Sequence, residues 1–274
     1  MALSKRRRTQ VLRVVQYVVL VAVVVALALL IDWQQVRRGF LDADAAARLF
    51  PGVILTGLKN TVIYAALGFA VGLALGLVLA LMRMSSVGPY RWLATAYIEF
   101  FRGVPALLVF IAFGFGVPLA FQLRFDTYST VALSLGLVGA AYMAETIRAG
   151  IQAVPKGQVE AARSLGMPAG MALFTIVIPQ AFRIILPPLT NELILLTKDS
   201  SLVYLLGVAR DEYELTKIGR EALNVSPNLT PILVAGLCYL IITIPLSQLS
   251  RYLERRTGGK RISSPESAGL EVKA

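Results

Sequence analysis

The chain has 274 residues, of which 57% are hydrophobic and only 16% are charged, and it carries a net charge of +11 at pH 7. Soluble domains usually have about 25% charged residues, and the apolar residues of this chain stand in long runs. This composition excludes disordered, collagenous and ordinary cytosolic proteins and indicates an integral membrane protein.

A membrane-spanning helix needs about 20 mostly apolar residues, and six stretches of the chain approach this length. Five stretches without a charged residue are 14–31, 61–82, 103–123, 127–144 and 229–250. The sixth, from about 181 to 207, contains Arg183, Glu192, Lys198 and Asp199. These lengths favour helices over the alternating ten-residue strands of a membrane barrel.

The first apolar run follows the basic residues 5–8 and resembles a signal peptide. It is longer than the apolar region of a usual signal peptide, so we predict an uncleaved anchor with its N-terminus in the cytoplasm. Six spans then place the C-terminus inside as well, with most of the basic loop residues. The exceptions, which fall outside, are Arg37, Arg38, Arg48 and Lys59.

Three glycines of the second run, Gly68, Gly72 and Gly76, recur every four residues on one helix face. Such rows allow two helix backbones to approach closely in lipid, so we predict a packing role for them.

The net positive charge does not indicate nucleic-acid binding, because the basic residues lie at the ends of the apolar runs. The sequence has no histidine and one cysteine, Cys238. These counts exclude Ser-His hydrolysis, histidine-ligated zinc, an internal disulfide and a cysteine-ligated metal cluster.

Charges inside the spans are candidate functional groups, because a charge in hydrocarbon costs several kcal/mol. Glu99 and Arg102 are three residues apart at the start of the third run, so they share a helix face and can pair. The following 103–105 segment, Gly-Val-Pro, is expected to weaken the helix and expose carbonyls near a cavity. Glu145 and Arg148 have the same spacing, and a structural role near the cytoplasmic interface is favoured for them.

The 181–207 stretch contains the most unusual group of polar residues. Pro187 and Pro188 predict an interrupted helix, and interrupted helices form binding sites for charged solutes in transporters. Glu192 and Asp199 are seven residues apart on one face, whereas Lys198 points roughly 100° away from Asp199. Solute contact is predicted here, with a structural Lys-Asp salt bridge as the alternative.

The loop between the fourth and fifth spans is amphipathic, with Val159, Ala162 and Leu165 on one face and Gly166 able to end a short helix. Such a helix fits the groove of a partner protein, although a helix lying on the membrane has a similar pattern.

The same loop resembles the EAA loop of ATP-binding-cassette importer permeases, through Glu160-Ala161-Ala162, Gly166 and the 176–179 segment Ile-Val-Ile-Pro. The segments 99–105, 144–150 and 198–202 are similar to the polar amino-acid subgroup, which takes up histidine, glutamine, glutamate and arginine. The resemblance covers residues 52–256. Ile178 stands where leucine is usual, and Val104 where threonine is frequent.

The resemblance implies an all-α membrane protein of the bacterial inner membrane. Its domains are 1–52, a basic N-terminus with an extra transmembrane helix and an external linker; 53–250, the five-helix permease core; and 251–274, a disordered cytoplasmic tail. It implies alternating access driven by two ATPase subunits, a second permease subunit (identical or different) and an extracytoplasmic solute-binding protein. The residues implied in ATPase coupling are Glu160, Ala161, Ala162, Gly166 and Pro179.

The chain has no Gly-x4-Gly-Lys-Ser/Thr phosphate loop. We therefore expect no enzymatic activity, no metal and no cofactor in this chain, with ATP and Mg in the partner ATPase.

The predicted solute site consists of Glu192, Asn191, Lys198, Asp199, Ser200, Gly103, Glu99 and Arg102. Its carboxylates favour an ammonium or guanidinium group, and Lys198 favours a carboxylate. The alternatives are a permease of the same architecture for an osmolyte or another small solute, an ion-coupled secondary transporter and a membrane-bound enzyme using carboxylate or lysine chemistry.

Overall fold

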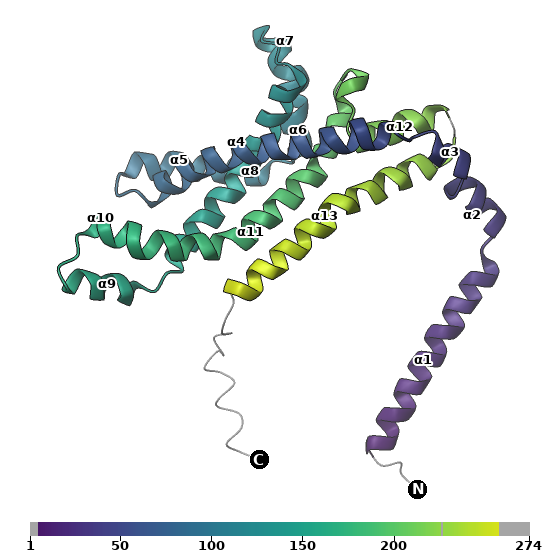
Figure 1. Ribbon diagram of the computed structural model, residues 1–274, viewed down its shortest axis with the longest axis horizontal. Coiled ribbons are helices and arrows are strands. Elements are labelled where there is room, and N and C mark those ends of the chain that lie inside the picture. The colour runs from purple at the N-terminus through teal and green to yellow at the C-terminus, as the bar shows by residue number, and fades with distance from the viewer. Residues whose placement is uncertain (1–4, 226, 258–274) are drawn as a thin grey trace.

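The computed structural model describes residues 5–225 and 227–257, and within these residues every regular element is a helix (Figure 1). Five stretches are long and apolar enough to cross a membrane, namely Gln10–Leu30, Val53–Met84, Thr127–Gln152, Ala169–Leu205 and Thr230–Thr257. A sixth candidate is the pair Gly88–Gly103 and Ala106–Phe121, which meet at a bend of 101°. The predicted all-α membrane protein with about six spans is confirmed.

The described helices follow one another along the chain with short connections. In order they are α1 (Lys5–Leu30), α2 (Trp33–Phe40), α3 (Ala43–Ala47), η1 (Val53–Leu58), α4 (Lys59–Met84), α5 (Gly88–Gly103), α6 (Ala106–Ile111), η2 (Ala112–Gly116), α7 (Val117–Phe121), α8 (Thr127–Gln152), α9 (Lys156–Ser164), α10 (Ala169–Ala172), η3 (Leu173–Val177), α11 (Ile178–Asp199), η4 (Ser200–Leu205), η5 (Arg210–Glu212), α12 (Leu215–Val225) and α13 (Thr230–Thr257). Helices α4, α8 and α11 form the centre of the bundle, and α13 packs along α11.

The tightest packing in the bundle joins α4 to α8 through the predicted glycine face. A Cβ atom on Gly72 would lie 3.3 Å from the carbonyl oxygen of Gly136, and one on Gly76 would lie 3.1 Å from that of Ala140. The two backbones approach this closely only because the glycines have no side chain. The predicted packing role is confirmed.

An ion cluster fastens α4 to α8 near the C-terminal ends of both helices. The Glu145 carboxylate pairs with Arg83 of α4 and, at 2.8 Å, with Arg148 of its own helix. Arg148 also donates to the side chain of Gln152 at 2.6 Å. The predicted Glu145–Arg148 pair is therefore present, and its contact with Arg83 ties two spans together.

The third span differs from its predicted extent of 103–123. The helical segment runs from Ala106 to Phe121, and α5 precedes it as a separate helix that the hydropathy pattern did not indicate. Val104 has an extended backbone (φ −96°, ψ 130°) and Pro105 has no N–H, so α5 ends at Gly103 and the chain turns sharply. The predicted weakening of the helix at 103–105 is confirmed.

Helix α11 is continuous through Pro187 and Pro188, so the predicted interruption at these prolines is wrong. Each proline removes one backbone hydrogen bond, but a helix packed in a membrane bundle tolerates this loss when its neighbours hold it in place. Pro187 is buried against α13, where the Ser250 hydroxyl donates to its carbonyl at 3.4 Å. The helical geometry changes only after Asp199, where a 3-10 segment begins.

Buried polar contacts hold the segment before α12 against α4 and α13. The Asn60 amide donates to the carbonyls of Asp211 and Tyr213, at 2.7 and 3.0 Å. The fully buried Glu214 carboxylate accepts from the backbone N–H of Lys217 at 2.7 Å and from the Tyr239 hydroxyl at 2.9 Å. Burial raises the pKa of Glu214 to about 7, although the hydrogen bonds that its carboxylate accepts act in the opposite direction.

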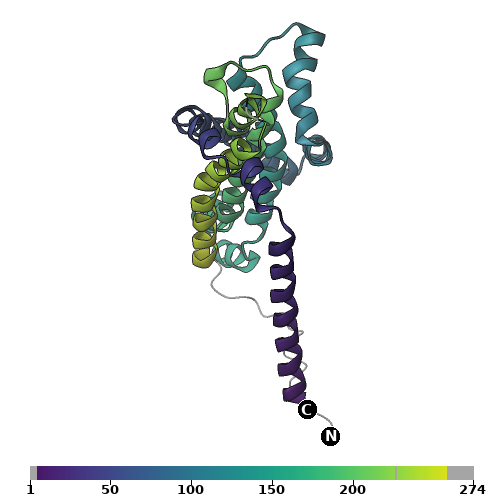
Figure 2. The same ribbon diagram turned by 90° about the vertical axis from the view of Figure 1, so that its right-hand side faces the viewer.

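The first helix extends away from the bundle. Figure 2 shows α1 pointing away from the other helices, and none of its residues from Gln10 to Leu30 is buried within the chain. It corresponds to the predicted extra N-terminal helix. Of the predicted tail, residues 251–257 continue α13 as helix, and residues 258–274 lie outside the described residues.

We predict that replacing Gly76→Leu destabilises the α4–α8 contact, because the new side chain meets backbone atoms that cannot move aside. Overpacking of this kind costs about 1–3 kcal/mol. The melting temperature of the detergent-solubilised protein should fall by several degrees. Gly236→Leu is the matched control, since a Cβ at this position of α13 meets nothing within 4 Å. Equal melting temperatures for the two variants would contradict the prediction.

Candidate functional site

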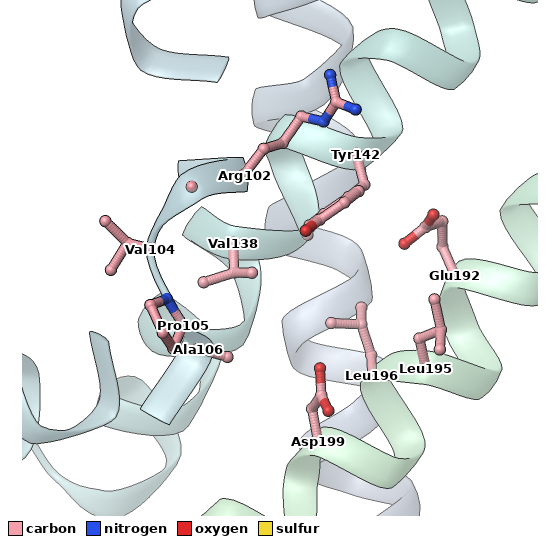
Figure 3. A pocket seen from close by; sticks show the side chains of 12 residues that line it. Arg102, Val104, Pro105, Ala106, Val138, Tyr142, Glu192, Leu195, Leu196 and Asp199 are labelled. Carbon is pink, nitrogen blue, oxygen red and sulfur yellow. The ribbon is translucent and has the colours of Figure 1, made fainter. Parts of the chain in front are cut away.

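A cavity of about 480 Å³ lies between the α5–α6 bend, α8 and α11 (Figure 3). It is lined by Arg102, Gly103, Val104, Pro105, Ala106, Val138, Gly139, Tyr142, Glu192, Leu195, Leu196 and Asp199. Each wall is a run of neighbouring or helically spaced positions, so the fold brings together three segments that are far apart in the sequence.

The local structure of each segment explains which residues reach the cavity. The turn after Gly103 removes the regular helix, so that backbone and small side chains form one wall. On α11 the lining residues are spaced by three, four and seven positions, which places Glu192 and Asp199 on one face. The predicted common face of these two carboxylates is confirmed.

The cavity contains one cationic and two anionic side chains. The Arg102 guanidinium lies over the Tyr142 ring, 5.9 Å from its centroid, and Figure 3 shows the Glu192 and Asp199 carboxylates on the α11 side. None of the ion pairs among the described residues joins Arg102 to either carboxylate. Opposite charges are therefore held apart across a space that a charged molecule can enter.

The remaining wall is apolar. Val138 of α8 and Leu195 and Leu196 of α11 lie between the charged groups (Figure 3). An apolar wall with a few polar groups that converge on it is the usual composition of a small-molecule site. Among the described residues, no group of three or more histidine, cysteine, aspartate or glutamate side chains is placed to hold a metal ion.

Four of the eight predicted site residues line this cavity, namely Glu192, Asp199, Gly103 and Arg102. Their role in binding stays a prediction, but the structure brings them together.

The other four predicted residues do not reach the cavity. Asn191 and Lys198 each precede a lining residue of α11 by one position, so they point to a different side of the helix and are exposed. Ser200 is buried, and its hydroxyl donates to the carbonyl of Thr197 at 2.7 Å. Glu99 lies one turn before Arg102 on α5 and is exposed.

Neither the possible pair of Glu99 with Arg102 nor the alternative salt bridge of Lys198 with Asp199 is formed among the described residues. Arg102 turns toward Tyr142 instead, and Lys198 turns away from the cavity.

Sequence reasoning missed Tyr142 and the apolar wall. In the sequence, a tyrosine of an apolar run that faces a cavity cannot be distinguished from one that faces lipid or the core. The only available signal is spacing, because Val138 and Tyr142 are four residues apart and therefore on one face of α8.

The amphipathic loop forms the predicted short helix, α9. The predicted apolar face is only partly free for a partner, because Ala162 is buried and Val159 packs against the bundle of this chain, whereas Leu165 is 89% exposed. The helix ends at Ser164, so Leu165 no longer follows the helical spacing of the apolar face. Gly166 then adopts a left-handed backbone with φ of +86°, which glycine allows without strain.

The exposed surface of α9 and its neighbourhood forms a second candidate site. Leu165 and Gly166 line a shallow groove with Met167, Met171 and Ile176. Glu160, Ala161 and Pro179 are also exposed. The side chain of Gln180 in α11 donates to that of Gln158 in α9 at 2.6 Å, so this surface is linked directly to a helix that lines the cavity.

Comparisons with known proteins identify the family of the chain. Residues 72–259 match the model of the family described as binding-protein-dependent transport system inner membrane component. The chain is 38% identical to the probable glutamine ABC transporter permease protein GlnM of Bacillus subtilis, over 74% of this chain and 92% of that protein. It is 37% identical to the arginine transport system permease protein ArtQ of the same organism, over 79% and 97%.

A solved structure has the same fold. The crystal structure of an amino acid ABC transporter with histidines matches with a TM-score of 0.71 and 35% identity, over 79% of this chain and 99% of that chain. The loop motif and the bundle thus lead to one family, and this chain belongs to the binding-protein-dependent transport system inner membrane components.

Proposed function

We propose that this chain is the permease subunit of an ATP-driven amino-acid importer, and that a basic amino acid binds in the cavity between the α5–α6 bend, α8 and α11. The observation that carries this proposal is the separation of Arg102 from Glu192 and Asp199 across the cavity. The names of the relatives support an amino-acid substrate, since they include permeases for glutamine and arginine.

The charges of the cavity are complementary to a basic amino acid. Its α-carboxylate matches Arg102, and its α-ammonium and cationic side chain match the carboxylates of Glu192 and Asp199. Two carboxylates and one guanidinium leave a charge of −1, which one basic amino acid neutralises. Charges in a low-dielectric site are costly unless they are paired, so a ligand with fewer cationic groups leaves one carboxylate without a partner.

The partners are those that the family resemblance implies. An ATPase subunit, which holds the ATP and Mg, docks on α9 and its neighbourhood through the exposed Glu160, Ala161, Gly166 and Pro179, whereas Ala162 is buried beneath this surface. A second permease subunit and an extracytoplasmic solute-binding protein complete the importer. Alternating access follows when movement of the ATPase pair displaces α9 and, through the Gln158–Gln180 contact, the α11 wall of the cavity.

We also propose that both termini are cytoplasmic, in the bacterial inner membrane. The end of α13 and α9 lie at the same end of the bundle in both views, which supports one cytoplasmic side for the tail and the ATPase surface (Figures 1 and 2).

The first test is uptake into liposomes that contain the purified chain, its ATPase, its binding protein and, if it is distinct, the second permease subunit. We expect ATP-dependent uptake of arginine or lysine in preference to glutamine and glutamate. ATP-dependent uptake of an osmolyte alone would contradict the amino-acid assignment and retain the permease. Uptake driven by an ion gradient without ATP would contradict the importer itself.

Neutralising either carboxylate should weaken binding of the basic amino acid. Glu192→Gln and Asp199→Asn each remove one charge-assisted contact, worth about 1.5–3 kcal/mol. We expect the KM for uptake to rise roughly 10- to 100-fold, since each 1.4 kcal/mol is tenfold.

Two further variants make this test decisive. Glu254→Gln, an exposed carboxylate at the end of α13, should leave the KM unchanged. Lys198→Gln distinguishes the residues that line the cavity from those that were predicted from the sequence. Lys198 belongs to the predicted set but faces away from the cavity. A large effect at Lys198 with none at Glu192 and Asp199 would refute the site as described.

Coupling to the ATPase should depend on the backbone of Gly166. Gly166→Val forces a β-branched residue into a left-handed conformation, at a cost of about 1–3 kcal/mol, whereas Gly166→Asn tolerates it. We expect stimulation of ATP hydrolysis by the solute-loaded binding protein to be lost in Gly166→Val and in Glu160→Lys. Gly166→Asn should retain it. If the Val and Lys variants fail to insert into the membrane, the loop is a folding element instead.

A further inference from the structure

Helix α2 is a short amphipathic element that nothing in the transport proposal uses. It begins directly after α1, and its N-terminus is capped by Asp32, which accepts from the backbone N–H of Gln34 and Gln35 at 2.9 and 3.1 Å. The indole N–H of Trp33 donates back to the carbonyl of Ala28 at 2.7 Å. These contacts fix the direction in which the chain leaves the first span.

The other end of α2 is attached to the start of the last span. The backbone N–H of Leu229 donates to the carbonyl of Gly39 at 2.7 Å, and the Thr230 hydroxyl accepts from the N–H of Asp42 at 2.9 Å. Asn228 also donates to the Asp42 carboxylate at 3.3 Å. Since α1 ends at Leu30 and α13 begins at Thr230, α2 is held where two membrane spans meet the aqueous phase.

The exposed faces of α2 differ in polarity. Trp33, Val36 and Phe40 recur at intervals of three and four residues and form one apolar stripe. No residue of α2 is buried, and Trp33 is 60% exposed. Arg37 borders the stripe, about 40° around the helix from Trp33, and Arg38 lies on the polar side.

The two arginines have no carboxylate partner within the described residues. The neighbouring aspartates are already engaged, because Asp32 caps α2 and Asp42 caps α3. Both arginines are exposed, and the charge of Arg37 lies beside the apolar stripe, whereas that of Arg38 lies on the opposite side of the helix. A surface with this pairing of apolar and cationic groups is complementary to anionic lipid.

We propose that α2 lies in the membrane interface and binds anionic phospholipid headgroups, with Trp33 and Phe40 among the acyl chains and Arg37 on the phosphates. This surface accounts for Arg37, one of the basic residues that the positive-inside pattern leaves on the outer side. The proposal depends neither on the transported solute nor on the orientation of the termini.

Tryptophan fluorescence gives a direct test, because the chain has only two tryptophans, Trp33 and Trp92. The full chain with Trp92→Phe is placed in nanodiscs of mixed phosphatidylglycerol and phosphatidylcholine, in which only one of the two lipids carries brominated acyl chains. At equal mole fraction of brominated lipid, we expect phosphatidylglycerol to quench Trp33 at least twofold more strongly. Adding Arg37→Gln and Arg38→Gln should make the quenching of Trp33 by the two lipids equal.

The matched control is Arg255→Gln with Arg256→Gln, at the other end of α13. It should preserve the stronger quenching of Trp33 by phosphatidylglycerol. Size-exclusion profiles and melting temperatures check that the variants remain folded. Equal quenching by the two lipids in the parent overturns the proposal, as does a preference that persists without Arg37 and Arg38. No quenching by either lipid also overturns it and assigns the surface to a protein partner instead.

Discussion

The close approach of α4 to α8 is the constraint on which the rest of the structure depends. In lipid there is little hydrophobic gain from bringing two apolar helices together, so contact between small residues must supply the attraction. Gly72 and Gly76 allow one backbone to touch the other. The Arg83–Glu145 ion pair then fastens the same two helices near their C-terminal ends.

Once α8 is fixed in this way, it positions both candidate sites. Its middle presents Val138 and Tyr142 to the cavity, and its end leads through a short turn into α9. Helix α11 contacts both regions as well, because Gln180 bonds to α9 while Glu192 and Asp199 line the cavity. The proposed coupling between the ATPase surface and the cavity therefore needs no long chain of contacts, since α8 and α11 each reach both regions.

The cavity depends on a bend and on charges that are kept apart. The turn at Val104 and Pro105 sets the Arg102 side of the site opposite α11 instead of continuing a straight span beside it. A protein that only needed to neutralise these charges would pair them, since an uncompensated charge in the membrane is expensive. Their separation leaves the pairing to a ligand, which is the physical basis of the proposed amino-acid site.

The sequence by itself determined the properties that belong to contiguous segments. Hydropathy predicted the membrane class and the number of spans, the spacing of Gly68, Gly72 and Gly76 predicted a packing face, and the phase of Glu192 and Asp199 predicted their common side. The loop motif at Glu160–Gly166 predicted the family, and about half of the proposed site residues reach the cavity.

Only the tertiary structure decided which residues meet across the bundle. Pro187 and Pro188 do not interrupt α11, because a proline's effect in a membrane helix depends on the neighbour that supports it, here α13. Tyr142 enters the site and Lys198 leaves it, although charge alone suggests the opposite. Periodicity assigns each residue to a face of its own helix, but what that face meets is set by helices that are distant in the sequence.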